Sequence, residues 1–178
     1  MSQQHHRPLF MPNARIVFCG MCKATSPSLA ETYYEQPGDK FWTTLHKVGL
    51  TPAVCKPVAY RQLMLFGLGL ADLKEEKAGL DHSAKFHENY IRKFTDDLIT
   101  HAPFIVAFNG KKAASLYFSI PTKKLSYGLQ TFSIGNSKVF ILPSTANSAS
   151  KFWNLTPWQD IALLAKQRPK SIPLKHAK

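Results

Sequence analysis

Three polar residues with the chemistry to act on a substrate lie in or beside apolar segments. Asp72 stands inside a short apolar segment, and its carboxylate can orient or deprotonate a water molecule. Asn109 directly follows the apolar run Phe104–Phe108, and its carboxamide presents a hydrogen-bond donor and an acceptor side by side. Cys22 follows Cys19 in a C-x-x-C spacing, which can serve redox chemistry or half of a metal site.

The cysteine pattern argues against a metal site. The chain has three cysteines, and no second C-x-x-C or H-x-x-x-H pair accompanies Cys19 and Cys22. A small, odd number of cysteines fits a reducing compartment rather than a disulfide scaffold. We therefore expect neither a metal nor an organic cofactor. Two thiol alternatives stay open: Cys22 as a nucleophile whose pKa Lys23 lowers, and a small redox or hydrolase-like protein that uses Cys19 and Cys22.

The elements that must position these residues alternate between strands and helices. Apolar runs predict strands at 15–20, 68–73 and 104–108, and a hairpin pairs 131–134 with 138–142 around Gly135-Asn136. Helical spacing predicts helices at 40–47, 59–66, 87–101, 111–118 and 156–167, with Asp39 and Thr156 as N-caps and Pro157 at the first position of the last helix. The order predicts a three-layer α/β/α fold with a central, mostly parallel sheet of four to five strands.

A ligand of such a sheet binds at the carboxyl ends of its strands. The loops after Cys19, Leu70, Phe108 and Leu142 are therefore the places to search for a site. Asp72 and Asn109 both belong to these regions.

Charge indicates the kind of partner. Lys and Arg number 23 against 11 Asp and Glu in 178 residues, a formal net charge of +12. Such an excess favours a polyanion, most often nucleic acid. We expect an N-terminal extension at 1–14, one domain at 15–167 and a basic tail at 168–178. No apolar run is long enough to span a bilayer, and no signal peptide is evident. We expect a cytoplasmic monomer, associated with the nucleoid if bacterial.

Several motifs occur in a fixed order along most of the chain. They are Ile16–Gly20 (I-V-F-C-G), Gln36–Trp42 (Q-P-G-D-K-F-W), Val48–Pro52 (V-G-L-T-P), Gly67–Leu73 (G-L-G-L-A-D-L), Phe108–Ala113 (F-N-G-K-K-A) and Leu142–Asn147 (L-P-S-T-A-N). In this order they resemble the mismatch-specific uracil/thymine-DNA glycosylase family of the uracil-DNA glycosylase superfamily. The resemblance implies base flipping and excision of uracil or a related deaminated or mismatched base from DNA, as in base excision repair.

The resemblance also implies roles for single residues. Tyr34 matches the ring on which the flipped base stacks, and Phe41 of the F-W segment belongs to the same substrate site. The first loop, with Gly20, Met21 and Lys23, would position the base and stabilise its anion through backbone N–H groups. The second loop would grip DNA phosphates through Ser144, Thr145, Ala146, Asn147 and Ser148. Lys111, at a helix start, is a further candidate phosphate contact.

One position departs from the family pattern. The first loop of the family reads G-I-N-P-G, and its Asn orients the attacking water, whereas Cys22 stands at that position here. A thiol makes only weak hydrogen bonds. Either another residue holds the water, with Asp72 the first candidate and Asn109 the second, or the chain binds DNA or a lesion without cleaving it. As a strand-end amide, Asn109 can also read a pyrimidine edge.

Overall fold

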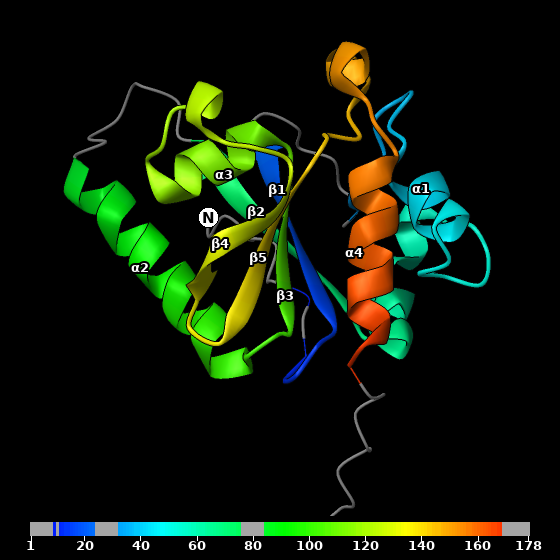
Figure 1. The fold of residues 1–178 in the computed structure, drawn as a ribbon, viewed down its shortest axis with the longest axis horizontal. Helices are drawn as coiled ribbons and strands as arrows, with labels where there is room; N and C mark the ends of the chain where they lie inside the picture. The colour runs from blue at the N-terminus through cyan, green and yellow to red at the C-terminus, as the bar shows by residue number, and fades with distance from the viewer. Residues whose placement is uncertain (1–8, 10, 24–31, 76–83, 169–178) are drawn as a thin grey trace, which may run out of the picture.

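The computed structural model describes residues 9, 11–23, 32–75 and 84–168. A central five-stranded sheet lies between two layers of helices (Figure 1). The strand order is β2-β1-β3-β5-β4, in which β4 alone runs antiparallel to its neighbour. The strands are β1 (Ile16–Lys23), β2 (Leu68–Glu75), β3 (Ile105–Asn109), β4 (Gly128–Ile134) and β5 (Ser137–Leu142). The predicted three-layer, mostly parallel α/β fold is confirmed, with five strands.

Four α-helices and three short 3-10 segments connect and cover the strands. They are α1 (Phe41–Lys47), η1 (Pro57–Phe66), α2 (Ala84–His101), α3 (Lys111–Phe118), η2 (Thr122–Lys124), η3 (Asn147–Phe152) and α4 (Thr156–Lys166). Helices α1 and α4 lie against one face of the sheet, and α2 and α3 lie against the other (Figure 1).

Side chains of the sheet alternate between two apolar cores, one under each helical layer. In β1, Ile16 and Phe18 face the core that α1 and α4 cover, and Val17 and Cys19 face the core under α2 and α3. All five residues of β3 are buried, as expected for a central parallel strand with helices on both sides. This double burial is why the strands read as continuous apolar runs.

Strand β2 ends at Glu75, α2 begins at Ala84 and β4 begins at Gly128, so each is two or three residues longer than predicted, and three further features differ. Strand β1 continues beyond residue 20 to Lys23, because the whole of it pairs with β2. Residues 57–66 form 3-10 turns rather than an α-helix, and their buried residues Tyr60 and Leu63 are three apart, the spacing that a 3-10 turn aligns. Helix α4 takes its first-turn cap from Asn154, whose side-chain oxygen accepts from the Thr156 N–H at 3.0 Å, rather than from Thr156.

Parts of several predictions lie outside the described residues: most of the N-terminal extension and of the basic tail, and the first loop from residue 24 to residue 31. Within the described part of the chain, no helix has the length and apolar character needed to cross a membrane.

Candidate active site

Around Gly20, the carboxyl-terminal halves of β1 and β2 lie beside the carboxyl end of β3. Asp72 pairs with Gly20 across β1 and β2, and Asn109 follows the last register pair of β1 with β3, Cys19 with Phe108. Strand alternation places all three on the sheet face that α1 and α4 cover. Because the middle position is a glycine, Asp72 and Asn109 flank a gap that has no side chain of its own.

Tyr34 reaches into this gap. A Cβ built on Gly20 would lie 2.5 Å from the Tyr34 hydroxyl oxygen and 3.1 Å from Asp72 Oδ1. Gly20 therefore permits a close approach that no other residue type allows without displacement. Tyr34 has a φ of 53°, an uncommon backbone conformation for a residue with a side chain. The ring is held in a specific place at some cost in backbone energy.

The ring of Tyr34 stacks on a fixed aromatic support. Its centroid lies 4.0 Å from that of Phe41, with 21° between the ring planes. Phe41 is fully buried, and Phe18, Trp42 and Trp158 surround it edge-on. Edge-to-face contacts of this kind favour one ring orientation. The support under Tyr34 is therefore part of the core.

The Tyr34 hydroxyl is buried, and the geometry of the described residues gives it no hydrogen-bond partner. Burial and the Asp72 charge raise the pKa of this hydroxyl, and the Asn109 carboxamide beside it partly lowers the pKa. A buried polar group without a partner costs about 1–3 kcal/mol. This end of the site therefore has unused capacity for hydrogen bonding.

Asp72 is held where its carboxyl is hard to ionise. Burial raises its pKa from 3.8 to about 6. Its backbone oxygen accepts a hydrogen bond at 2.9 Å from the hydroxyl of Tyr90 in α2, which fixes the strand end. At neutral pH the group is a carboxylate that is more basic than an ordinary aspartate, a property that general-base catalysis uses.

Asn109 is locked to the second loop by two hydrogen bonds to one residue. Its Nδ2 donates to Thr145 Oγ1 at 2.9 Å, and its Oδ1 accepts from the Thr145 N–H at 3.1 Å. Both residues are buried, Thr145 completely. The Thr145 side chain faces inward, toward Asn109 rather than toward solvent.

A third segment completes this arrangement. Asp39 Oδ1 accepts from the Phe41 N–H at 2.9 Å, so Asp39 supports the start of α1, although the N-cap residue is Lys40 rather than Asp39. Burial raises the pKa of Asp39, while hydrogen bonds from Phe41 and the Thr145 hydroxyl lower it. The Lys40 N–H also donates to the Thr145 carbonyl at 3.0 Å. The segment before α1 and the second loop are thus joined through Thr145.

Other residues of the second loop differ in exposure. Asn147 and Ser148 are exposed, whereas Ser144 and Ala146 are half-buried. Asn147 packs against Gly38, where a Cβ would lie 2.9 Å from the Asn147 Cγ and where φ is +80°. Lys111 extends over the ring of Tyr127, with its Nζ 4.5 Å from the ring centroid, so this ammonium contacts an aromatic ring of its own chain.

The thiols offer little for chemistry in the described part of the chain. Cys19 is fully buried, and burial followed by the Asp72 charge raises its pKa far above the ordinary value. Such a thiol is inert, which argues against the redox alternative. Met21 is half-buried beside the core under α2 and α3. The backbones of Cys22 and Lys23 lie in β1, and their side chains fall outside what the structure describes.

The structure thus brings Gly20, Tyr34, Phe41, Asp72 and Asn109 together, whereas the Lys111 ammonium contacts the ring of Tyr127. Sequence reasoning missed the link from Thr145 to Asn109 and the part that Asp39 plays beyond capping. No local pattern signals the first, because the two residues are 36 positions apart. Among the described residues, no group of three or more His, Cys, Asp or Glu side chains is arranged to hold a metal ion.

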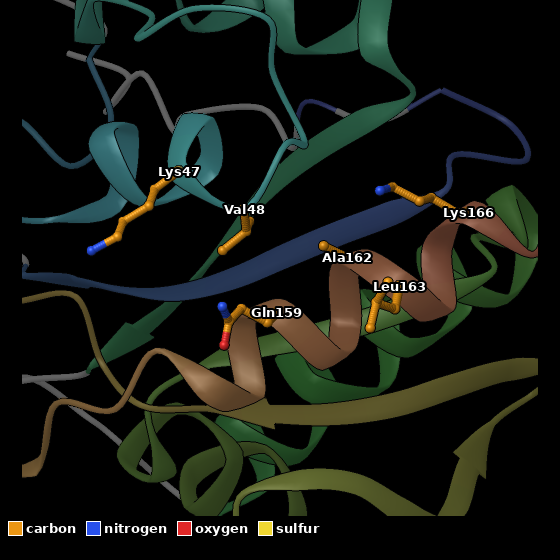
Figure 2. Close-up of a pocket in the computed structure, with 6 residues that line it drawn as sticks. All are labelled: Lys47, Val48, Gln159, Ala162, Leu163 and Lys166. Atoms are coloured by element: carbon orange, nitrogen blue, oxygen red, sulfur yellow. The ribbon is translucent and has the colours of Figure 1, made fainter.

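A separate open groove runs between α1 and α4. Figure 2 shows Lys47 and Lys166 at its two ends, and the remaining lining residues are Val48, Gln159, Ala162 and Leu163. No acid, nucleophile or aromatic ring lines it. The residues around Gly20 therefore remain the candidate site.

A comparison with protein families gives one match of high coverage. The model described as the uracil DNA glycosylase superfamily matches residues 8–166. The match spans all five strands and all four α-helices, including the site around Gly20.

Proposed function

Because the chain belongs to the uracil-DNA glycosylase superfamily, whose members are typically hydrolytic DNA glycosylases, we propose that it excises uracil or a related deaminated or mismatched base from DNA. The observation that carries the proposal is the cluster around Gly20, with Asp72 on one side, Asn109 on the other and the hydroxyl end of Tyr34 reaching in between them. It combines an aromatic surface, a hydrogen-bonding amide and a basic carboxylate. Uracil release, with no lyase step, is the simplest reaction of such a site.

Tyr34 is the proposed stacking ring. A base rotated out of the helix loses its stacking on neighbouring bases and needs a replacement surface. Tyr34 supplies the ring, and the Phe41 ring stacks on one of its faces with the two centroids 4.0 Å apart. Because Phe41 is fully buried, it cannot move away when the base binds. Stacking on an aromatic side chain contributes about 1–3 kcal/mol per base. Asn109 then reads the edge of the base.

Asp72 is the proposed general base. A water oxygen bonds to the sugar C1′ as the bond from C1′ to the base nitrogen breaks, and a water proton passes to the Asp72 carboxylate. The base leaves as an anion, which backbone N–H groups of the first loop can stabilise. A carboxyl pKa of about 6 keeps Asp72 ionised at neutral pH while making it a stronger proton acceptor than a solvated aspartate.

The second loop and η3 are the proposed DNA contact. Because Thr145 is buried, phosphate contacts are assigned to Ser144, Asn147 and Ser148 and to backbone N–H groups. Phe152 at the end of η3 is 58% exposed, whereas Trp153 next to it packs on the core. We assign to Phe152 the part of the apolar wedge that enters the space left by the flipped nucleotide.

The direct test uses labelled oligonucleotides that carry uracil, hypoxanthine, xanthine or a G:T mismatch, followed by alkaline cleavage of abasic sites. We expect a base-specific cut, a loss of at least about 100-fold in Asp72→Asn, and wild-type rates in Asp160→Asn. Asp160 is an exposed aspartate of α4 and so controls for the loss of one charge. Full turnover in Asp72→Asn would remove Asp72 from the mechanism.

A second candidate function is recognition without cleavage. The observation that favours it is Cys22, which replaces the water-orienting Asn of the related family. A protein of this kind would bind the same oligonucleotides with a strong dependence on salt and cut none of them. The cleavage assay and a binding titration at two salt concentrations distinguish the two functions.

A further inference from the structure

The hydrogen bonds around Thr145 determine which way round the Asn109 carboxamide sits. A backbone N–H can only donate, so the atom that faces the Thr145 N–H must be the amide oxygen, Oδ1. The amide nitrogen consequently faces Thr145 Oγ1 and donates to it at 2.9 Å. In the flipped amide, the Asn109 NH2 group would face the Thr145 N–H, and both donors would be buried without an acceptor. The flipped orientation should therefore be several-fold to more than tenfold less populated.

Asp39 determines which atoms donate and which accept in the hydrogen bonds around Thr145. The Thr145 hydroxyl accepts from Asn109 and therefore has its own hydrogen free to donate. Asp39, whose pKa this hydroxyl lowers, is the carboxylate placed to receive it. Asp39 also accepts a hydrogen bond from the Phe41 N–H at 2.9 Å, and this bond ties the carboxylate to the start of α1. Donation thus runs one way, from Asn109 to Thr145 to Asp39.

One hydrogen of the Asn109 amide nitrogen remains after these bonds are made. It lies on the side of the Tyr34 hydroxyl, whose pKa the Asn109 carboxamide lowers. The amide oxygen is already engaged by the Thr145 N–H. The group that Asn109 presents to the gap is therefore an N–H donor.

We propose that Thr145 is a positioning residue that, backed by Asp39, locks the Asn109 carboxamide with its N–H toward the gap and so selects bases that carry a carbonyl acceptor there. The inference rests on the proposed function for its substrate and, for its geometry, on the two hydrogen bonds between Asn109 and Thr145. A base with hydrogen or an amino group at the same position meets the donor without an acceptor. Thr145 does this from the inside of the second loop and does not touch the base.

The test compares cleavage of uracil with cleavage of 2-pyrimidinone, which has hydrogen in place of the 4-carbonyl, in the same single-stranded oligonucleotide. In the wild type, kcat/KM should favour uracil by about tenfold or more. Thr145→Val keeps the shape and loses the hydroxyl, so the ratio should fall toward one, whereas Thr145→Ser should restore it. Asp39→Asn, which leaves Thr145 in place, should lower the ratio in the same direction. A Thr145→Val enzyme that loses both activities equally, or neither, overturns the proposal.

A second measurement does not depend on activity. The side-chain NH2 signals of Asn109, identified by their loss in Asn109→Ala, should exchange slowly with solvent in the wild type and at least about tenfold faster in Thr145→Val. Equal exchange in the two proteins overturns the positioning role. If the wild type cuts neither oligonucleotide, the proposed function fails, and the exchange measurement still decides whether Thr145 orients Asn109.

Discussion

Replacing Asp72 by asparagine is expected to make the protein more stable at pH 7, although it removes the proposed catalytic carboxylate. Burial raises the pKa of Asp72 from 3.8 to about 6, so the folded protein holds the ionised group at a cost. At about 1.4 kcal/mol for each pH unit, the full cost at pH 7 is about 3 kcal/mol. Because part of the side chain reaches solvent, we expect a gain of about 1–3 kcal/mol from the neutral, isosteric amide.

The gain must depend on pH with a definite sign. Well below pH 4 the carboxyl is protonated in both the folded and the unfolded protein, and the penalty is absent. The penalty grows as pH rises from about 4 to about 6, where only the unfolded chain is ionised, and it is constant above that range. Cys19 and Tyr34, whose pKa values burial raises further above neutral, stay uncharged throughout this window.

Thermal and urea unfolding of the wild type and of Asp72→Asn at pH 7 and pH 4 measure this effect. At pH 7 the melting temperature of the variant should be higher by a few to about 10 °C, and the difference should fall to a small fraction of this value near pH 4. Asp160→Asn, on an exposed face, should change little at either pH. A variant that is no more stable at pH 7, or whose gain persists at pH 4, would refute the account of Asp72 as a buried, destabilised carboxylate.

Four further outcomes follow from the same geometry. The kcat/KM for uracil release should rise with pH through about 6 and then level off, because the Asp72 carboxylate is the active form; a flat profile from pH 5 to 8 in steady-state assays would contradict this. Gly20→Ala should reduce turnover by 100-fold or more, on the order of 3 kcal/mol, because the added Cβ would lie 2.5 Å from the Tyr34 hydroxyl oxygen. A rate near that of the wild type would show that the Tyr34 ring can move aside freely. Tyr34→Phe should keep the affinity for DNA and raise the free energy of unfolding in urea by about 1 kcal/mol. Tyr34→Leu should weaken binding to uracil-containing DNA by about 10-fold or more in a fluorescence titration. Equal affinities of the two variants would remove the stacking role. Phe152→Ala should slow cleavage of duplex DNA more than that of single strands, with Leu163→Ala, at another exposed apolar position, as the control; equal slowing of both substrates would argue against a wedge.

Most of the fold could be predicted because its elements carry local signals. The run 104–108 is apolar at every position since β3 is covered on both faces, and this pattern is visible without knowing the neighbours. The bounds of α3 match the prediction. The errors arise where pairing or packing decides: β1 is prolonged to Lys23 by its pairing with β2, and residues 57–66 coil as 3-10 turns although their composition suits an α-helix.

The candidate site divides in the same way. Asp72 and Asn109 could be named from the sequence because they are polar residues in or directly after apolar segments, in the carboxyl-terminal parts of strands that a parallel sheet gathers on one side. Tyr34 and Phe41 came from a resemblance, and the structure shows that they form one stack. Their roles in catalysis and binding await the experiments proposed above.

The sequence by itself determined the class of fold, the basic character of the surface and the candidates for chemistry, since each depends on residue type and short spacing. Only the tertiary structure decided that Gly20 leaves room for the Tyr34 hydroxyl, and that Thr145 holds Asn109 across 36 positions. Those contacts depend on strand register and on distances of a few tenths of an ångström. The direction of the Asn109 amide is likewise set by the donors and acceptors that the folded chain places around it.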